Sequence, residues 1–406
     1  MLDCLNIYAE QWELSVNLGK TNVMVFNKSS RILNCAYGFK LGTQELFPVR
    51  NYCYLGIKIS LNGTFKQAIE DLRKKALRAF FSIRRTVNTR ALTTSTMLKL
   101  VDSLIKPVAT YGCPIWLHST NIMKTFVAAN DCASLPKTST GDALETTHLR
   151  ILKWILGIHR KANNNFCYGD TGRLPWTISV VPQCVEYFLR ASTCDAIGVN
   201  TLLHCTFQEQ KNLQLSWYKT WYESIDKCTR TFPSLTPAAA TLKHLSSTFI
   251  EHWSSELKSQ SKMRFYCSVK TEFKEEPYLQ LPKRSSRINI AKLRSSSHDL
   301  WIERGRYLKH STSDALRACR YCCEPDQLEG LLHLPHSEPP ILESEEHVLT
   351  ECPGYHPIRA KLSDNLLSLL LLKEYGTIMV SCHLPEFGRY LTHCFNLRNP
   401  KRTPDS

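Results

Sequence analysis

Residues 66–85, KQAIEDLRKKALRAFFSIRR, decide the fold class of this 406-residue chain. Apolar side chains recur there at helical spacing and form one stripe, made of Ile69, Leu72, Ala76, Phe80 and Ile83. This period predicts an amphipathic helix whose opposite face carries Lys74, Arg78 and Arg85. Such a row of cations could grip nucleic-acid phosphates in a sequence-independent way, or it could be an ordinary solvated helix face.

The helical period returns along most of the chain, whereas strand signals are confined to its beginning. After a short helix in the first dozen residues, the strand signals are Asn22–Phe26, Phe39–Leu41 and Tyr52–Ser60. Further helices are expected over Met97–Trp116, Thr147–Leu156 and Leu213–Ile225. We therefore expect an α+β protein that is mostly helical, with a small antiparallel β region near its N-terminus.

A Gly-Lys-Thr at residues 19–21 raises the question of a nucleotide-binding P-loop. That loop needs another glycine five positions before the glycine of Gly-Lys-Thr, and Leu14 stands at that position. A P-loop also follows a strand and opens a helix, whereas here the predicted strand comes after Lys20. The P-loop interpretation fails.

The composition favours a polyanionic partner. The formal net charge is +15 and the pI is near 9.1, a balance that suits RNA or DNA, although a merely basic protein would share it. The length and the 43% of hydrophobic residues leave room for about two or three domains. Seventeen scattered cysteines, no signal-peptide pattern and no apolar run that could span a bilayer predict a nuclear or cytoplasmic protein.

Cysteines and histidines with metal-ligand spacing occur near the C-terminus. Cys319 and Cys322 form a C-x2-C pair, and His347 and Cys352 form an H-x4-C pair. Two such local pairs are typical of one tetrahedral, structural zinc ion. Competing ligands are Cys323, His333, His336 and His356. The alternative interpretation is a set of reduced cysteines and surface histidines.

Aromatic residues cluster around a lysine further upstream. The cluster consists of Trp217, Tyr218, Trp221 and Tyr222, with Lys219 between them. Nucleic-acid bases could stack on these rings. The alternative interpretation, which is the more common outcome for such a cluster, places the rings in the core.

Five regions in this order, the last made of three separate stretches, resemble the C-terminal part of non-LTR (LINE-type) retrotransposon reverse transcriptases. LNIYAEQWELSVNLGKTNVMVFN (5–27) resembles the end of the polymerase palm, YCYLGIKIS (52–60) the following strand near the primer grip, and LRKKALRAFFSIRR (72–85) the start of the thumb. THLRILKWILGIHRKANNNFCYGDTGRLPW (147–176) is similar to a later segment of the same polyproteins. AKLRSSSHDLWIERGRY (291–307), CRYC (319–322) and EEHVLTECPGY (345–355) resemble their zinc-knuckle region.

The resemblance implies roles and boundaries that the residues alone do not. Lys20 would lie near the phosphates of an incoming nucleotide, with Asn17 and Thr21 shaping its turn; otherwise the three only hold that turn. The implied domains are a palm remnant (1–65), a thumb-like helical domain (66–127), a linker or insertion (128–147), a helical connector (148–300), a CCHC zinc-knuckle region (301–375) and a C-terminal tail (376–406).

The departure from the family lies in the catalytic carboxylates. In the family, aspartates that include a Y-A-D-D turn hold two divalent ions at the primer end. This sequence has no adjacent pair of aspartates, so no catalytic residue is assigned and magnesium is expected only in a full-length parent enzyme.

Three interpretations follow from these observations. The first is a C-terminal fragment of an RNA-directed DNA polymerase that binds RNA and DNA, largely without sequence preference, and does not polymerise alone. The second is a retained, non-catalytic nucleic-acid-binding protein. The third is a truncated element without a function.

Overall fold

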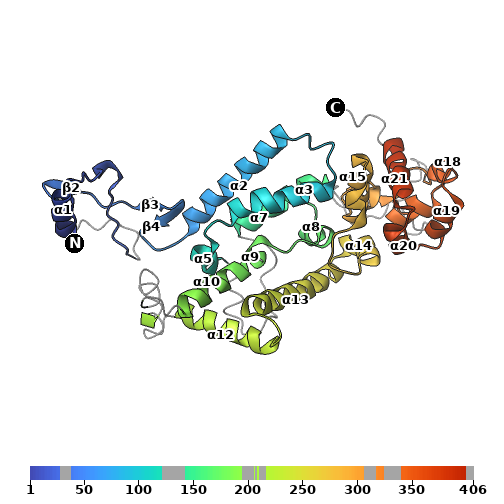
Figure 1. The fold of residues 1–406 in the computed structure, drawn as a ribbon. Helices are drawn as coiled ribbons and strands as arrows, with labels where there is room; N and C mark the ends of the chain where they lie inside the picture. Colours follow the sequence, from blue (N-terminus) through green and yellow to red (C-terminus); the bar gives the residue numbers. More distant parts are fainter. Residues whose placement is uncertain are drawn as a thin grey trace, which may run out of the picture.

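The protein is mostly helical, with two small two-stranded sheets, which confirms the α+β expectation (Figure 1). This computed structural model describes residues 1–27, 38–120, 142–193, 205, 208–209, 216–305, 317–323 and 340–398. Within these ranges no helix combines the length and the apolar character that a membrane span needs.

In the N-terminal part, the described residues form helix α1 (Leu2–Gln11), a 3-10 turn (Leu18–Lys20) and both sheets. The first sheet pairs β1 (Phe39–Leu41) with β2 (Gln44–Leu46) in antiparallel register, with Phe39 opposite Leu46. The turn between them uses Gly42 at φ +60°, a conformation that glycine adopts without steric cost. The strand signal at Phe39–Leu41 is therefore confirmed.

One strand prediction in this part is wrong, and another is confirmed with an interruption. The stretch at Asn22–Phe26 forms only an isolated bridge between Val23 and Pro48, and Pro48 has no N–H with which to extend a ladder. The stretch at Tyr52–Ser60 is two strands, β3 (Asn51–Tyr54) and β4 (Ile57–Ser60), paired antiparallel. Leu55 and Gly56 reverse the chain between them at φ 46° and 82°.

The predicted amphipathic helix is present as α2 (Lys66–Thr86), and it buries Leu72, Ala76 and Phe80. It packs against α7 (Ala143–Leu156) and α4 (Lys106–Ala109). The helix expected over Met97–Trp116 is a succession of short ones: α3 (Thr94–Leu100), a π turn (Val101–Ile105), α4 and α5 (Cys113–Trp116).

The middle of the chain begins with α7, which packs against α8 (Asn164–Thr171) and α9 (Trp176–Ser179). Its other helices are α10 (Val181–Thr193), α12 (Ser216–Thr231) and α13 (Pro237–Lys258). α7 begins at Ala143, inside the expected linker at 128–147, because the Asp142 side chain caps it by accepting from the Leu144 N–H. Residues 128–141 of that linker lie outside the described residues.

The C-terminal part is a cluster of shorter helices, drawn in yellow to red in Figure 1. They are α14 (Arg264–Val269), α15 (Arg284–Arg294), α16 (Trp301–Arg304), α18 (His356–Arg359), α19 (Asp364–Leu371), α20 (Tyr375–Val380) and α21 (Leu384–Arg398). α21 and all but the first residue of α20 fall within the expected tail at 376–406, yet α21 packs on α15 and buries Phe387 and Leu391. One continuous apolar core runs from α2 to α21.

Candidate metal centre

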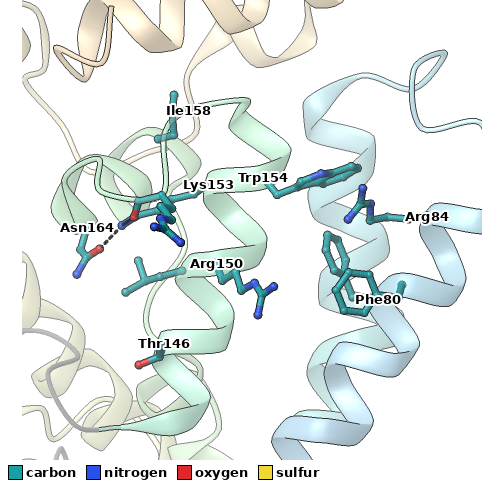
Figure 2. Close-up of a pocket in the computed structure, with 11 residues that line it drawn as sticks. Phe80, Arg84, Thr146, Arg150, Lys153, Trp154, Ile158 and Asn164 are labelled. Carbon is teal, nitrogen blue, oxygen red and sulfur yellow. Dashed lines mark hydrogen bonds between the residues drawn. The ribbon is translucent and has the colours of Figure 1, made fainter. Parts of the chain in front are cut away.

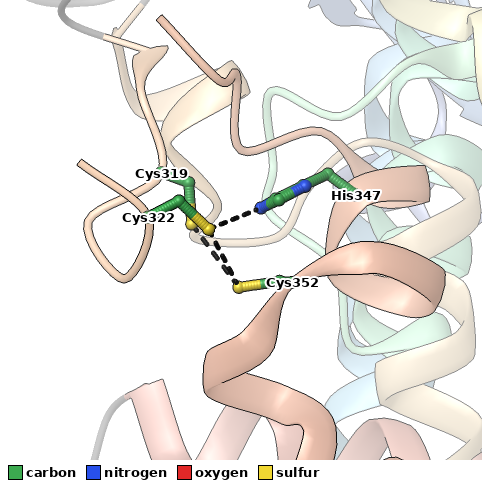
Figure 3. Close-up of side chains that lie close together, drawn as sticks. All are labelled: Cys319, Cys322, His347 and Cys352. Carbon is green, nitrogen blue, oxygen red and sulfur yellow. Dashed lines mark hydrogen bonds between the residues drawn. The ribbon is translucent and has the colours of Figure 1, made fainter.

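Four side chains from two separate segments meet at one point in the C-terminal part. They are the ligands predicted from spacing, Cys319, Cys322, His347 and Cys352, and their donor atoms all lie within 4.8 Å of one another (Figure 3). Cys319 and Cys352 are fully buried. The structure thus brings together both halves of the sequence pattern.

Local backbone geometry presents each pair of ligands. Ala318 forms an antiparallel bridge with Leu342, and the chain then turns so that the Cys322 and Cys323 N–H groups both donate to the Cys319 carbonyl. His347 is the first residue of a single π-helical turn, His347–Glu351, and Cys352 directly follows this turn. The Cys352 N–H closes the turn by donating to the His347 carbonyl at 2.8 Å.

Two residues from later helices hold this π turn in place. The Arg359 guanidinium of α18 donates to the carbonyls of Leu349 at 3.1 Å and Cys352 at 3.1 Å. The Tyr390 hydroxyl of α21 donates to the Leu349 carbonyl at 3.0 Å. The ligands are therefore anchored to the folded core and not only to their own loops.

The distances between the donor atoms match the edges of a zinc tetrahedron. The sulfur of Cys352 lies 3.6 Å from that of Cys319 and 3.8 Å from that of Cys322. Zn–S bonds of about 2.3 Å at tetrahedral angles place two sulfurs about 3.8 Å apart. The Cys322 sulfur lies 3.3 Å from Nε2 of His347, so a single zinc ion fits within this group.

The surroundings of the histidine also suit a metal, whereas a zinc ion would have to displace the proton that Cys319 holds, because cysteine binds zinc as a thiolate. The hydrogen bond with Cys352, together with burial, raises the pKa of the Cys319 thiol to about 11, and the same bond lowers the pKa of Cys352. Glu351 lies 3.4 Å from Nδ1 of His347, the atom that faces away from the sulfurs. A carboxylate there would orient the ring and leave Nε2 for the metal.

The competing ligands do not join the group where the structure describes them. Cys323 is partly buried and His356 is exposed, and neither belongs to the cluster. His333 and His336 lie outside the described residues.

The residues expected near a nucleotide hold a turn. The Asn17 side chain accepts from the Lys20 N–H, and the Thr21 hydroxyl donates to the Asn17 carbonyl at 2.9 Å. Lys20 itself is exposed. The contacts explain Asn17 and Thr21 structurally, and a role of Lys20 beside phosphate stays a prediction.

The expected nucleic-acid contacts lie on one exposed face of α2. At about 100° per residue, Lys74, Arg78 and Arg85 fall within about 40° of one another, and all three are exposed. Lys74 lies 4.0 Å from Glu70, which also binds Arg73. Nucleic-acid binding by this face stays a prediction.

The aromatic cluster divides between core and surface. Trp221 is buried and stacks on Phe188 of α10 with ring centroids 6.2 Å apart, whereas Tyr222 is exposed. The side chains of Trp217, Tyr218 and Lys219 lie outside what the structure describes.

Sequence reasoning missed an ion cluster in the core, which consists of Asp170, Lys270, Glu276 and Arg294. Arg294 and Asp170 are fully buried, and the guanidinium donates to both carboxylate oxygens, at 2.9 and 2.8 Å. Glu276 pairs with both Arg294 and Lys270. No local pattern reveals this cluster, although Asp170 and Arg294 both belong to stretches that carry the family resemblance.

Comparison with known proteins gives one informative match. No family model matches the chain, and no solved structure is similar to it. An uncharacterized transposon-derived protein of Caenorhabditis elegans is 31% identical over 104 residues, which cover 25% of this chain and 36% of that protein. The chain therefore matches only about a third of the length of this relative. The similarity, together with a Cys3His group that could hold zinc, supports a transposable-element origin for this chain.

Proposed function

We propose that this chain is a C-terminal part of a retrotransposon reverse transcriptase that binds RNA and DNA and does not polymerise by itself. The observation that carries the proposal is the Cys3His group, which closes in space from the two pairs that resemble the family's zinc knuckle. The transposon-derived relative supports the same origin.

The zinc ion in this proposal is structural. Cys319, Cys322, His347 and Cys352 would supply four ligands and leave no open position for a substrate or a water molecule. The ion would hold residues 317–323 against the π turn and stabilise the C-terminal part of the core. Its effect on nucleic acid would be indirect, through the position of the surrounding helices.

Binding in this proposal comes from the cations of α2. Lys74, Arg78 and Arg85 would neutralise phosphates and release counterions, so that affinity falls as the salt concentration rises. Because contacts to phosphates carry little sequence information, we expect RNA and DNA of many sequences to bind.

The test is a filter-binding titration of the 406-residue protein with mixed-sequence RNA at 50 and 200 mM salt. Replacing Lys74, Arg78 and Arg85 by Glu should weaken binding by at least tenfold and flatten its salt dependence. The matched control replaces three exposed cations elsewhere, Lys258, Lys361 and Arg389, by Glu. Equal loss in both variants would reject the α2 face, and no retention of RNA by the wild type at 50 mM salt would reject nucleic-acid binding.

A primer-extension assay tests the other half of the proposal. The purified protein, given a primed template, magnesium and deoxynucleotides, should add no nucleotide. Extension above the level of a heat-denatured sample would contradict the expectation of an inactive polypeptide.

A further inference from the structure

A second basic surface lies on a different side of α2, in the groove between α2 and α7 (Figure 2). Its volume is about 880 Å³. Four cations line it: Arg84, Arg150, Lys153 and Arg160. Three aromatic residues line it as well: Phe80, Phe81 and Trp154. Among the residues that the structure describes, no carboxylate lines this groove.

Within the described part of the chain, the cations of the groove have no carboxylate partner. The Lys153 amine donates to Asn164 Oδ1 at 2.7 Å and to the Arg160 carbonyl at 3.0 Å, which uses two of its three hydrogens. Arg84 and Arg150 extend from α2 and α7 into the space between the helices (Figure 2). Positive charge concentrated in this way, without an internal counter-charge, is complementary to a phosphate chain.

The aromatic part of the groove already contains a stack. The Arg84 guanidinium lies 4.4 Å from the centre of the Trp154 ring, and Trp154 meets the Phe80 ring edge-on at 5.2 Å. Phe81, beside them, remains 39% exposed. Nucleic-acid bases stack on guanidinium planes as well as on aromatic rings, so the outer face of Arg84 could extend this stack by one more layer.

We infer that the groove between α2 and α7 binds a single-stranded segment of nucleic acid, with a base stacked on Arg84 and the neighbouring phosphates on Arg150, Lys153 and Arg160. A single strand fits better than a duplex, because a duplex keeps its bases stacked inside and offers only its backbone to such rings. This inference rests on the proposed nucleic-acid binding and assigns the single strand to a place away from Lys74, Arg78 and Arg85.

The first test separates stacking from charge. Arg84→Lys keeps the charge and removes the plane, so affinity for a 12-nucleotide single strand should fall about 5- to 10-fold with an unchanged salt slope. Arg150→Lys, the matched control in the same groove, should bind within about twofold of the wild type. On an abasic strand of the same length Arg84→Lys should bind like the wild type, and RNA and DNA versions of both strands show whether the sugar matters.

The second test concerns the phosphates. Arg150→Glu combined with Arg160→Glu should lower the salt slope for single strands by about 1.4, the value for two lost contacts. Lys258→Glu combined with Arg389→Glu carries the same change of net charge at exposed sites elsewhere. Circular dichroism of each variant confirms that the helices are intact.

Each possible outcome of these tests overturns a different claim. Wild-type affinity for a single strand in both Arg84→Lys and the Arg150/Arg160 variant would overturn the groove while leaving binding by the α2 face in place. A loss in Arg84→Lys that persists on the abasic strand would overturn the stacked base. Failure of the wild type to bind any nucleic acid at 50 mM salt would overturn the proposed function, and this inference with it.

Discussion

The metal centre and the ion cluster both join separate segments of the same core, but their residues are spaced differently along the chain. The four metal ligands come from two local pairs, each within one turn of chain, and each pair is visible in the sequence. Asp170 and Arg294 stand 124 residues apart and meet only because α8 and α15 are packed into one core. The comparison shows that donor spacing within one turn can be read from sequence, whereas a pair made across the core cannot.

The two sites also differ in what their polar groups need. The thiols and the histidine, 3.3–3.8 Å from one another, could hold a metal ion, which would come from outside the chain. In the ion cluster two cations and two carboxylates already balance. We therefore expect the stability that the metal centre contributes to depend on a metal ion from the solution. The stability that the ion cluster contributes should depend only on its own residues.

The largest expected effect is the loss of metal from the C-terminal part. Cys322→Ser combined with Cys352→Ser should abolish a stoichiometric zinc ion and lower the free energy of unfolding by about 5 kcal/mol or more, because metal binding and folding are coupled. Zinc content by atomic absorption and chemical denaturation measure both. The double replacement of Cys4 and Cys53, which are exposed and outside the cluster, is the control. Unchanged zinc content in the first variant would reject this ligand set.

Removing one charged partner from the ion cluster should destabilise the protein more than removing two. Asp170→Asn leaves the buried Arg294 guanidinium with Glu276, a carboxylate that it shares with Lys270, in place of two carboxylates. We expect a loss of about 3–5 kcal/mol in the free energy of unfolding. Asp170→Leu combined with Arg294→Met removes both charges and should recover most of that loss. Chelators should leave both effects unchanged, in contrast to the metal centre.

If the double variant proved no more stable than Asp170→Asn, packing of the long Arg294 side chain would outweigh its charge. The rings of Tyr266 and Tyr278, 5.3 and 5.7 Å from the guanidinium carbon, are the contacts to test next. Either result shows what stabilises the ion cluster, in contrast to the metal centre, which an external ion would complete.

The smallest expected effect comes from Asp142, a buried carboxylate that no cation accompanies among the described residues. Burial first, and then the nearby charge of Glu145, raise its pKa to about 6, against 3.8 for an ordinary aspartate. The folded state therefore holds the proton more tightly than the unfolded chain does. Stability falls as the pH rises from about 4 to 6, and the full cost is present above pH 6.

Asp142→Asn removes this cost and keeps the helix cap, because asparagine caps as well as aspartate. We expect the variant to be more stable than the wild type by about 1–3 kcal/mol at pH 7.5, with the difference closing near pH 4. Thermal unfolding across this pH range measures it. A constant difference at every pH would show that ionisation of Asp142 is not the cause.

Much of this protein could be predicted wherever the physical cause is local. The stripe from Ile69 to Ile83 predicted α2, and the Cys319/Cys322 and His347/Cys352 pairs predicted a group that the structure assembles. Prediction failed where the pairing of backbone segments decides whether a strand forms and where it ends. Val23 forms only an isolated bridge with Pro48, and a reversal at Leu55 and Gly56 divided one expected strand into two.

By itself, the sequence determined the helical character, the positive charge and the two local pairs of metal ligands, because each follows from residue type and spacing along one segment. Only the tertiary structure decided that the pairs share one centre, that Asp170 meets Arg294, and that Arg84 and Arg150 line a common groove. The physical reason is that helix period is set by the nearest turns of the backbone. Contacts between distant segments depend instead on how apolar faces pack against one another across the whole core.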